Sequence, residues 1–346
     1  MIANFRSDNE TPVAPAMMQA ILDANHGTAW AYADDDWSMR LNQVFSELFR
    51  TEAIALPVST GTVANSIALA TVTPPWGSVF CHTGAHIYGD EGGAPEFFGN
   101  GLRLVPVAGK NGKLDPAALE KAVQAVEGHG VHSYQPSLLS LTQATEAGTL
   151  YTIDEVRALC DSAHALGMHT HMDGARFGNA IAALGCHPGE VTVEAGIDML
   201  SFGASKNGCM AAEALLIFNQ PQWYATAERL RKRSGHLLSK MRYVSAQLLA
   251  YVENDRWLEM ARHANRQALR FAEAIENHAD ARLEYPVQAN EVFLNWTKAG
   301  FDHLEAHGIQ FGLWPGRDDL ARFVFGHSTS DAEVDLLVKS LISTIA

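Results

Sequence analysis

The chain has 346 residues, of which 47% are hydrophobic and 18% charged, so it can bury one large core and a second, smaller one. Its formal net charge of −14 argues against nucleic acid or an anionic membrane as a partner, because both attract clustered Lys and Arg side chains. The first ten residues lack the apolar stretch of a signal peptide, and no later segment approaches the roughly 18 apolar residues of a membrane-spanning helix.

The four cysteines indicate a reducing compartment. They lie far apart and show no C-x-x-C spacing, which is typical of free thiols rather than of disulfides or a zinc site. They are Cys81, Cys160, Cys186 and Cys209. We therefore expect a cytoplasmic protein that binds a small molecule.

Short apolar runs alternate with longer amphipathic stretches over the first two thirds of the chain, as in strands joined by crossover helices. The expected strands are 54–58, 78–81, 138–142, 168–172, 199–202 and 214–218, and the clearest helices between them are 63–71 and 153–166. Before them, the acidic triplet 34–36 is interpreted as a solvated loop or a helix cap. This pattern predicts an α/β domain with one sheet.

The last third has a different pattern. It begins with a single expected helix, 224–252, which would lead into a smaller α+β domain. The other expected elements are helix 257–278, strands 291–296 and 320–325, and a helix from 331. We predict an N-terminal segment 1–45, a large domain 46–235 and a small domain 236–346.

Polar residues follow four of the expected strands. In open α/β sheets ligands bind beyond the carboxyl ends of the strands. Thr60, Gln143, Asp173 and Lys206 should therefore gather at one crevice.

Asp173 and Lys206 suggest a cofactor. A lysine flanked by small residues can form a Schiff base with pyridoxal 5′-phosphate (PLP), and an acidic side chain can pair with its pyridinium nitrogen. The segment 59–62, Ser-Thr-Gly-Thr, offers hydroxyls and the start of a helix to a phosphate. The same four residues also describe an ordinary helix cap and tight turn.

A metal site is the alternative. His169, His171 and Asp173 share one face of an expected strand, and such a set could bind Zn²⁺ in a metal-dependent hydrolase. A further ligand would have to come from His82, His86 or His132. Because this reading leaves Lys206 and the phosphate turn unexplained, we expect PLP and no metal.

Several segments resemble the low-specificity L-threonine aldolases, and the resemblance runs nearly end to end. The segments that carry it are 7–9, 57–62, 85–86, 90–98, 142–146, 171–177 and 206–208. His-Met-Asp-Gly-Ala-Arg-Phe followed downstream by Ser-Lys-Asn-Gly is specific, whereas Ser-Thr-Gly-Thr is not. Thr73–Gly77 and the Gly-Ala-Pro-Glu-Phe-Phe run look most like the bacterial branch that includes phenylserine aldolases.

The resemblance implies a fold and a set of cofactor ligands. The fold would be that of the PLP-dependent transferases, fold type I, with a mainly parallel seven-stranded sheet and a smaller α+β C-terminal domain. Lys206 would hold PLP, His86 would stack on the ring, and Asp173 would pair with the ring nitrogen. The remaining cofactor-binding residues would be Thr60, Gly61, Thr62, Arg176 and Lys232.

The resemblance also implies a substrate site. Ser7, Arg176 and Arg322 would bind the substrate carboxylate, Asp90 would line the side-chain pocket, and His132 would lie near the substrate hydroxyl as a second catalytic histidine. In the family, the basic residue that matches Lys232 reaches the phosphate bound by a neighbouring subunit. This implies active sites at the dimer interfaces of a homotetramer.

The implied activity is retro-aldol cleavage of L-threonine, L-allo-threonine or L-phenylserine to glycine and an aldehyde. His86 or His132, directly or through water, would remove the hydroxyl proton, because imidazole titrates near neutral pH. The same scaffold also supports transamination and β-elimination, so these stay alternatives, and the metal-dependent hydrolase is a remote one.

Overall fold

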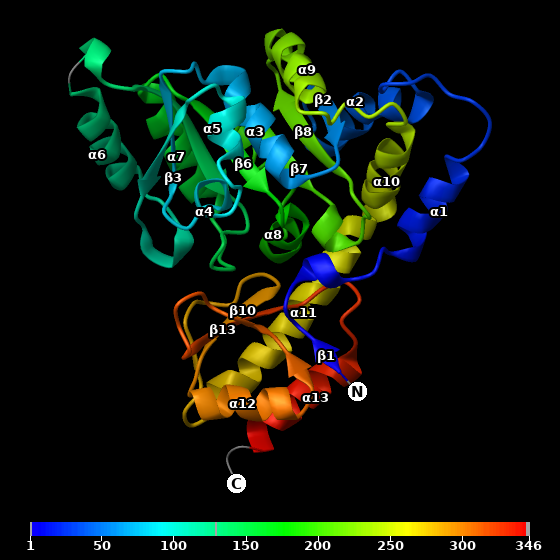
Figure 1. Cartoon of the computed structure of the whole chain (residues 1–346), viewed down its shortest axis with the longest axis vertical. Coiled ribbons are helices and arrows are strands. Elements are labelled where there is room, and N and C mark those ends of the chain that lie inside the picture. The colour runs from blue at the N-terminus through cyan, green and yellow to red at the C-terminus, as the bar shows by residue number, and fades with distance from the viewer. Residues whose placement is uncertain (1, 129, 344–346) are drawn as a thin grey trace.

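The computed structural model describes residues 2–128 and 130–343. Outside the described residues lie 1, 129 and 344–346. Residue 1 belongs to the predicted N-terminal segment, residue 129 to the predicted large domain and residues 344–346 to the predicted small domain. The chain forms a large body built on one sheet and a smaller body below it, and α11 (Arg256–Glu276) runs from one to the other (Figure 1).

The large sheet is the one expected from the alternating pattern. In their order across the sheet, its strands are β2 (Ala53–Val58), β8 (Glu213–Phe218), β7 (Met199–Gly203), β6 (His169–Gly174), β5 (Gln135–Thr142), β3 (Gly77–His82) and β4 (Arg103–Val107). Strand β8 is antiparallel to both neighbours, and the other adjacent pairs are parallel. The prediction of a mainly parallel seven-stranded sheet is confirmed.

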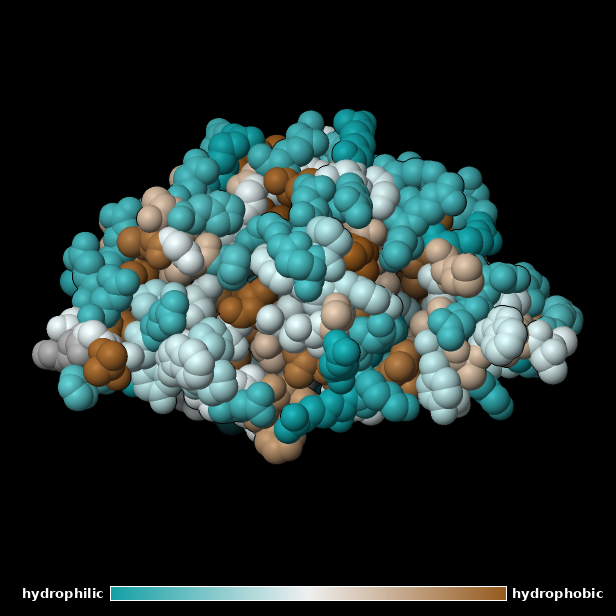
Figure 2. Space-filling model, turned by 90° about the horizontal axis from the view of Figure 1, so that it is seen from above, coloured by the Kyte–Doolittle hydropathy of each residue, from teal (hydrophilic) through white to brown (hydrophobic). Residues whose placement is uncertain are grey.

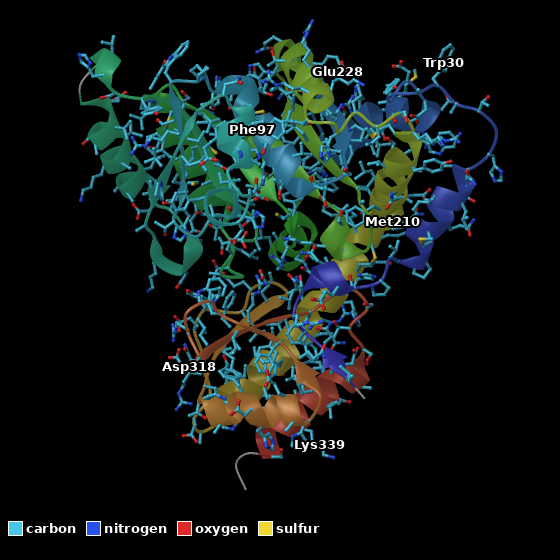
Figure 3. The ribbon with its side chains drawn as sticks, viewed as in Figure 1. Trp30, Phe97, Met210, Glu228, Asp318 and Lys339 are labelled. Atoms are coloured by element: carbon cyan, nitrogen blue, oxygen red, sulfur yellow. The ribbon has the colours of Figure 1, made fainter. Side chains whose placement is uncertain are left out.

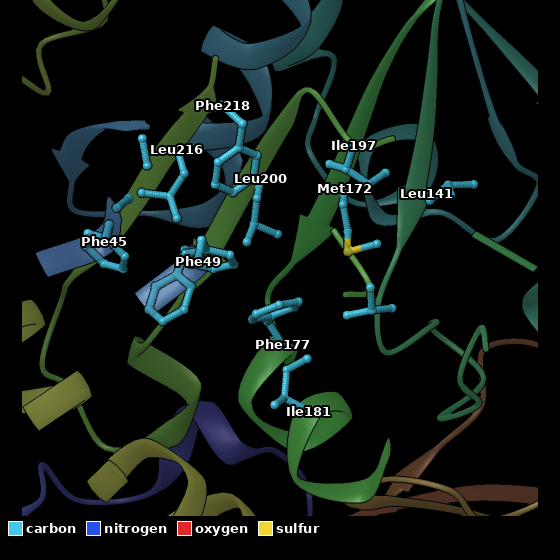
Figure 4. Packing of buried hydrophobic residues seen from close by; sticks show 14 of the residues in the cluster. Phe45, Phe49, Leu141, Met172, Phe177, Ile181, Ile197, Leu200, Leu216 and Phe218 are labelled. Carbon is cyan, nitrogen blue, oxygen red and sulfur yellow. The ribbon is translucent and has the colours of Figure 1, made fainter. Parts of the chain in front are cut away.

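Helices cover both faces of this sheet, so its central strands are buried along almost their whole length. One face packs mainly against α2 (Asp36–Phe49), α6 (Pro116–Glu127), α7 (Ile153–Ala165), α8 (Phe177–Leu184) and α10 (Arg242–Val252), and the other against α3 (Gly61–Val72) and α9 (Tyr224–Arg233). Consecutive residues alternate between the two cores: Leu200 and Leu216 face the first, and Met199 and Leu215 the second. Figure 4 shows the first core, where Phe49 and Phe177 stack.

The small body contains an antiparallel sheet and the N-terminal strand. Its strands are β12 (Gly312–Leu313), β13 (Leu320–Val324), β10 (Glu291–Asn295) and β9 (Arg282–Leu283), with β1 (Ala3–Asn4) paired to β11 (Ile309–Gln310) beside them. Helices α11, α12 (Lys298–Ala306) and α13 (Asp331–Ile342) cover this sheet. Phe5 packs against Phe325 in its core, so the first residues of the chain belong to the small body.

The single helix predicted over 224–252 is wrong. The structure has α9 and α10 with an irregular segment between them, because Gly235 takes a φ of +81° just after α9 ends. In that segment His236 Nδ1 lies 3.0 Å from Ser59 Oγ. The break therefore carries the chain back to the turn after β2.

The acidic triplet caps a helix. Asp35 is the N-cap of α2, and its carboxylate accepts from the Ser38 amide at 2.9 Å. The other short helices are α1 (Pro15–Asp23), α4 (His86–Gly89) and α5 (Ala94–Phe98). The predicted boundary at 235/236 stays a prediction; α10, which follows it, packs on α1 and α2 of the large body.

The outer surface of the large body is largely hydrophilic, with small separated hydrophobic patches when seen from above (Figure 2). Within the described part of the chain, the helices are all too short or too polar to cross a membrane.

Candidate active site

A cavity of about 320 Å³ opens at the carboxyl ends of β6 and β7, next to the first turn of α3. It brings together six of the residues predicted from the sequence. These are Thr60, Gly61, Thr62, His86, Asp173 and Lys206. Gln143, expected at the same crevice, is instead fully buried behind it, where its side chain bonds the backbone of Tyr151.

Lys206 lies on the short 3-10 helix η5 (Ser205–Asn207), which follows β7. The next residue anchors this turn, because the side-chain Nδ2 of Asn207 donates to Tyr251 Oη at 2.7 Å and to the Trp257 carbonyl at 2.9 Å. Among the described residues, none accepts a hydrogen bond from the Lys206 amine or forms an ion pair with it. The turn is therefore fixed while the amine stays available to a ligand.

Asp173 ends β6 at the cavity wall and is 4% exposed. Its Oδ1 accepts from the Ala175 amide at 3.0 Å and its Oδ2 from Asn65 Nδ2 at 2.9 Å. A carboxylate has about four lone-pair positions, so Asp173 is held in place and can still accept a further hydrogen bond from the cavity side.

His86 is part of a polar chain on the same wall. Its Nδ1 lies 3.0 Å from Glu91 Oε1, which also accepts from Asn65 Nδ2 at 2.8 Å. The hydrogen bond to Glu91 raises the pKa of His86, although burial opposes the charge. Burial raises the pKa of Glu91. Asn65 thus links Glu91 to Asp173, so His86 and Asp173 share one network.

The first turn of α3 supplies an anion site. Thr60 is its N-cap, and Thr60 Oγ1 accepts from the Val63 amide at 3.4 Å. The amides of Gly61 and Thr62 precede Ala64, whose amide is the first to donate to a helix carbonyl, that of Thr60, at 3.3 Å. They therefore have no partner in the helix, and the helix dipole adds positive potential there. Among the described residues, a methyl group added at Gly61 would meet no heavy atom within 4 Å other than those of its chain neighbours and its own helix backbone. This leaves room for a phosphate.

These residues fit PLP. An available lysine amine, a buried carboxylate and a helix N-terminus whose Gly61 and Thr62 amides have no partner in the helix line the same cavity, and they match the aldehyde, ring nitrogen and phosphate of that cofactor. Two buried polar atoms of the network, Asn65 Oδ1 and Glu91 Oε2, also lack a hydrogen-bond partner among the described residues.

His132 does not line this cavity within the single chain, and its predicted catalytic role stays a prediction. It lies exposed on η3 (Gly130–His132), just before the first residue of β5. The cavity is at the other end of the sheet. Strand β5 has 8 residues, so at the rise of an extended strand its two ends lie about 23 Å apart. His86 is therefore the histidine that this chain places beside Lys206.

Arg176 is also placed differently from the prediction of direct substrate and cofactor contact. Its Nε and Nη2 donate to Asp8 at 2.7 and 3.0 Å, and its Nη1 lies 3.3 Å from Glu291 Oε2. Burial opposes the charge of Arg176, but Asp8 and Glu291 outweigh it and raise the pKa. The guanidinium is held by two hydrogen bonds to Asp8 and an ion pair with Glu291, so it acts as a support between the two bodies.

The other predicted substrate ligands surround this support. Arg322 Nη1 lies 3.5 Å from Glu291 Oε1, and 29% of the Arg322 side chain is exposed. We call Asp8, Arg176, Glu291 and Arg322 the junction cluster. Ser7 caps the adjacent short helix η1 (Asp8–Glu10), where its Oγ accepts from the Asn9 amide at 3.1 Å, and Asn9 lines the cavity.

Like Ser7, His132, Arg176 and Arg322, two further predicted residues lie outside the cavity lining of this chain. Asp90 is exposed at the end of α4. Lys232 is exposed on α9 with its amine 4.6 Å from the centre of the Tyr32 ring, a cation–π arrangement.

The three groups of the metal alternative do not converge. His171 is buried between Ser140 Oγ and Ser201 Oγ, each 2.9 Å from one ring nitrogen, and burial lowers its pKa to about 4. His169 instead faces Asp198 at 3.8 Å. In residues 2–128 and 130–343, His, Cys, Asp and Glu side chains do not form a group of three or more suited to a metal ion.

Sequence reasoning assigned no role to three polar residues of the cavity lining: Asn65, Glu91 and Glu213. A signal existed for each of them. Asn65 interrupts an apolar helix, Glu91 follows His86 by five residues, and Glu213 begins an otherwise apolar strand. A polar residue in such a place is costly to bury unless it is bonded.

Comparisons with known proteins agree with this geometry. A family model described as beta-eliminating lyase matches residues 4–299. The low-specificity L-threonine aldolase of Pseudomonas aeruginosa is 40% identical over 97% of this chain and 96% of that protein, and that of a Pseudomonas species is 39% identical over 95% and 94%.

Solved structures share the fold. A threonine aldolase of Leishmania major superposes with a TM-score of 0.93 at 25% identity, covering 99% of this chain and 100% of that one. Serine palmitoyltransferase of Sphingomonas wittichii, at 15% identity, a TM-score of 0.76 and coverage of 99% and 86%, shares the fold alone. The prediction of fold type I is confirmed. The chain therefore belongs to the beta-eliminating lyase family, and within it to the low-specificity L-threonine aldolases.

Proposed function

We propose that this chain is a PLP-dependent carbon–carbon lyase that cleaves L-threonine, L-allo-threonine and L-phenylserine to glycine and an aldehyde. One observation carries the proposal: Lys206, Asp173 and His86 line the same cavity, beside the first turn of α3, whose Gly61 and Thr62 amides have no partner in the helix. When bound, PLP supplies an electron sink for the charge that develops at the substrate α-carbon.

Each cavity residue has a task in this proposal. The Lys206 amine binds the cofactor covalently, and the amides of Gly61 and Thr62 bind its phosphate. Asp173 keeps the ring nitrogen protonated, because an ionised carboxylate favours the positive charge beside it. The bonds from Asn65 and Ala175 hold the Asp173 carboxyl group in place for this task.

His86 is the proposed base for the substrate hydroxyl. An ionised Glu91 accepts the Nδ1 proton of His86, which leaves a lone pair on Nε2. That nitrogen can take the hydroxyl proton, directly or through one water, as the Cα–Cβ bond breaks and the aldehyde leaves. The α-carbon then takes up a proton, and glycine is the second product.

The substrate carboxylate is assigned to Arg322 and Ser7. Arg322 has exposed donors beyond its 3.5 Å contact with Glu291, and a carboxylate is a suitable bidentate partner for a guanidinium. Arg176 supports this site indirectly, because it holds both Glu291 and Asp8. Asp90 stays a candidate for the wall of the side-chain pocket.

We further propose a homotetramer with active sites at its dimer interfaces. Large apolar side chains are exposed near the cavity and on the N-terminal loop, including Met210 at 53% and Trp30 at 81%; Trp30 lies at the upper right edge of the molecule in Figure 3. Lys232, exposed on α9, would reach the neighbour's phosphate. Light scattering of the purified protein tests this; a stable monomer with full activity would refute it.

A cytoplasmic location is also proposed, supported by four cysteines that are all free. Reducing conditions keep thiols in this state. Fractionation of cells that express the chain tests the assignment.

The deciding experiment is an absorbance spectrum of the purified protein with PLP, before and after addition of L-threonine, L-phenylserine and glycine, with aldehyde assayed in the same sample. A visible band of lysine-bound PLP that changes with glycine, together with release of acetaldehyde or benzaldehyde, is the expected result. The ratio of the two aldehydes measures the preference for methyl or phenyl. Absence of the band after reconstitution would refute the proposal.

β-Elimination is the second candidate, because the matching family model is described as a beta-eliminating lyase. It would release ammonia and a keto acid from β-substituted amino acids, whereas transamination would require a keto-acid acceptor. A visible band with ammonia release and no aldehyde would favour elimination over aldol cleavage.

A further inference from the structure

The turn between β2 and α3 is tied to the irregular segment that follows α9. His236 Nδ1 lies 3.0 Å from Ser59 Oγ. Arg231, in the last turn of α9, donates from Nη1 to the Pro57 carbonyl at 3.3 Å. Both contacts reach the chain just before Thr60, the N-cap of α3. The end of α9 and the segment after it therefore help to place the turn that faces the cavity.

His236 lies behind this turn. Ser59 lines the cavity and His236 does not, so the imidazole can act on a ligand only through the Ser59 hydroxyl. The His236 amide donates to the Arg231 carbonyl at 3.0 Å, and Gly235 before it takes a φ of +81°, which a residue with a side chain rarely adopts. The imidazole is thus held by its own backbone, independently of any ligand.

A phosphate at this turn would find few cationic side chains within one chain. Among the described residues that line the cavity, Lys206 is the one lysine or arginine, and its amine is assigned to the aldehyde of PLP. The phosphate would therefore rely on the amides of Gly61 and Thr62, on the helix dipole and on the neighbouring hydroxyls. Its ionised oxygens accept hydrogen bonds, so the direction of each hydroxyl proton matters.

The hydrogen bond between Ser59 and His236 can run in either direction. Burial lowers the pKa of His236, so near pH 7 the ring is neutral and has one N–H. If that proton is on Nε2, the Ser59 hydroxyl donates to Nδ1 and offers only lone pairs to the cavity. If the proton is on Nδ1, His236 donates to Ser59 Oγ, and the hydroxyl proton is free to face the cavity.

We propose that His236 is a positioning residue for the cofactor phosphate: it donates from Nδ1 to Ser59 Oγ and so directs the Ser59 hydroxyl proton to a phosphate at the first turn of α3. The identity of the ligand rests on the proposed function, because PLP is what brings a phosphate to this turn. The role concerns binding of the phosphate and not the cleavage step. It can therefore be measured without a substrate.

The test compares the binding of PLP with that of pyridoxal, which has the same aldehyde and ring but no phosphate. The full chain, freed of bound cofactor, is titrated with each compound, and the visible band of the lysine-bound aldehyde gives the two Kd values. We call the Kd for pyridoxal divided by the Kd for PLP the phosphate preference. His236→Leu should lower this preference about 10-fold and leave the Kd for pyridoxal unchanged, which also shows that the cavity is intact.

His236→Asn is the conservative variant. The side-chain amide of Asn can place an N–H donor where Nδ1 of histidine lies, so the phosphate preference should return to within about threefold of the parent value. His303→Leu is the matched control. His303 Nε2 lies 3.1 Å from Ser343 Oγ in the small body, so this change breaks a similar bond away from the cavity and should leave both Kd values as they were.

A double-mutant cycle with Ser59→Ala separates this role from a structural one. Ser59→Ala removes the hydroxyl and should itself lower the phosphate preference about 10-fold. His236→Leu should then have no further effect, because His236 acts through the missing hydroxyl. If His236 only holds the turn in shape, it will lower the preference equally with and without Ser59. That result would overturn the proposal, as would a parent-like preference in His236→Leu.

The two proposals fail in distinguishable ways. If the parent chain binds PLP but releases no aldehyde from β-hydroxy amino acids, the proposed function is refuted, and the phosphate preference still tests His236. If the parent chain cleaves these substrates and His236→Leu keeps its preference, the aldolase proposal stands and the role of His236 is refuted. A parent chain that binds PLP no more tightly than pyridoxal would also refute that role.

Discussion

The cavity and the junction cluster are built from the same kinds of charged residue and use them in opposite ways. In the cavity, Lys206 makes no hydrogen bond to a described residue, and Asp173 and His86 each keep an acceptor or ring nitrogen open. In the junction cluster, all three nitrogens of the Arg176 guanidinium face Asp8 or Glu291.

This difference separates binding a ligand from holding two bodies together. A buried ion pair holds its two partners in one relative position, because removing either partner leaves an uncompensated charge. A partly satisfied group costs stability and gains the ability to react. Variants in the two regions should therefore affect different measurements.

The largest effect is expected from Lys206→Ala. The variant has no amine to bind PLP covalently, so the visible band should vanish and turnover should fall more than about a thousandfold. The unfolding midpoint should change little, because the amine makes no hydrogen bond with the described residues. Lys121→Ala, an exposed lysine of α6, is the control. A Lys206 variant that kept band and turnover would end the assignment.

The next effect belongs to the junction cluster and concerns stability. Asp8→Asn leaves Arg176 without its bidentate carboxylate and should lower the free energy of unfolding by about 3–5 kcal/mol in urea titrations. Arg176 lowers the pKa of Asp8 against the effect of burial. The carboxylate's contribution is thus present at neutral pH and is lost as the pH falls through that lowered value.

Asp302→Asn is the matched control, since Asp302 forms an exposed pair with Lys298 and such pairs contribute little. The difference between the parent and the Asp8 variant should shrink in acid. Similar unfolding curves at neutral pH would show that the cluster does not hold the two bodies.

A smaller effect is expected where the two regions meet. Arg322→Ala removes an exposed charged donor, so KM for the amino acid should rise about 10- to 100-fold with kcat nearly unchanged. Arg317→Ala changes another partly exposed arginine of the small body, paired with Asp319, and should leave KM as it was. An unchanged KM in the Arg322 variant would remove it from the carboxylate site.

The sequence predicted the cavity better than the junction cluster, for a physical reason. Lys206 and Asp173 each follow an apolar run that the local pattern identifies as a strand. Because ligands bind beyond the carboxyl ends of the strands in an open α/β sheet, the meeting of these two residues could be inferred. Arg176 pairs with Asp8 across 168 positions, and no local pattern reveals such a partner. The resemblance indicated that Arg176 is a site residue, but not that its guanidinium faces Asp8 and Glu291.

The same contrast holds for the fold. Six of the seven strands of the large sheet were predicted within a few residues, because apolar runs mark buried strands, whereas the edge strand β4 was not among them. The break after α9 was missed, since it depends on the positive φ of Gly235 and on the contact of His236 with Ser59. The role of His132 stays a prediction, because a motif match gives no distance along the strand that follows it.

The smallest effect tests whether the cavity network tunes a proton. Glu91 raises the pKa of His86 through its hydrogen bond. If neutral His86 is the base, activity rises as the pH passes that raised value. Glu91→Gln removes the negative charge, so the pKa of His86 should fall and the acidic limb of kcat/KM should move to lower pH by up to about one unit.

Turnover of the Glu91 variant will also drop, because an amide can hold the wrong imidazole tautomer; the position of the limb is therefore the informative quantity. Glu127→Gln, an exposed carboxylate at the end of α6, should leave the limb in place. A limb that stays fixed in the Glu91 variant would mean that His86 is not the group titrating there. Its bond to Glu91 would then be structural, like the bonds of the junction cluster, and the open Nε2 would no longer distinguish the two regions.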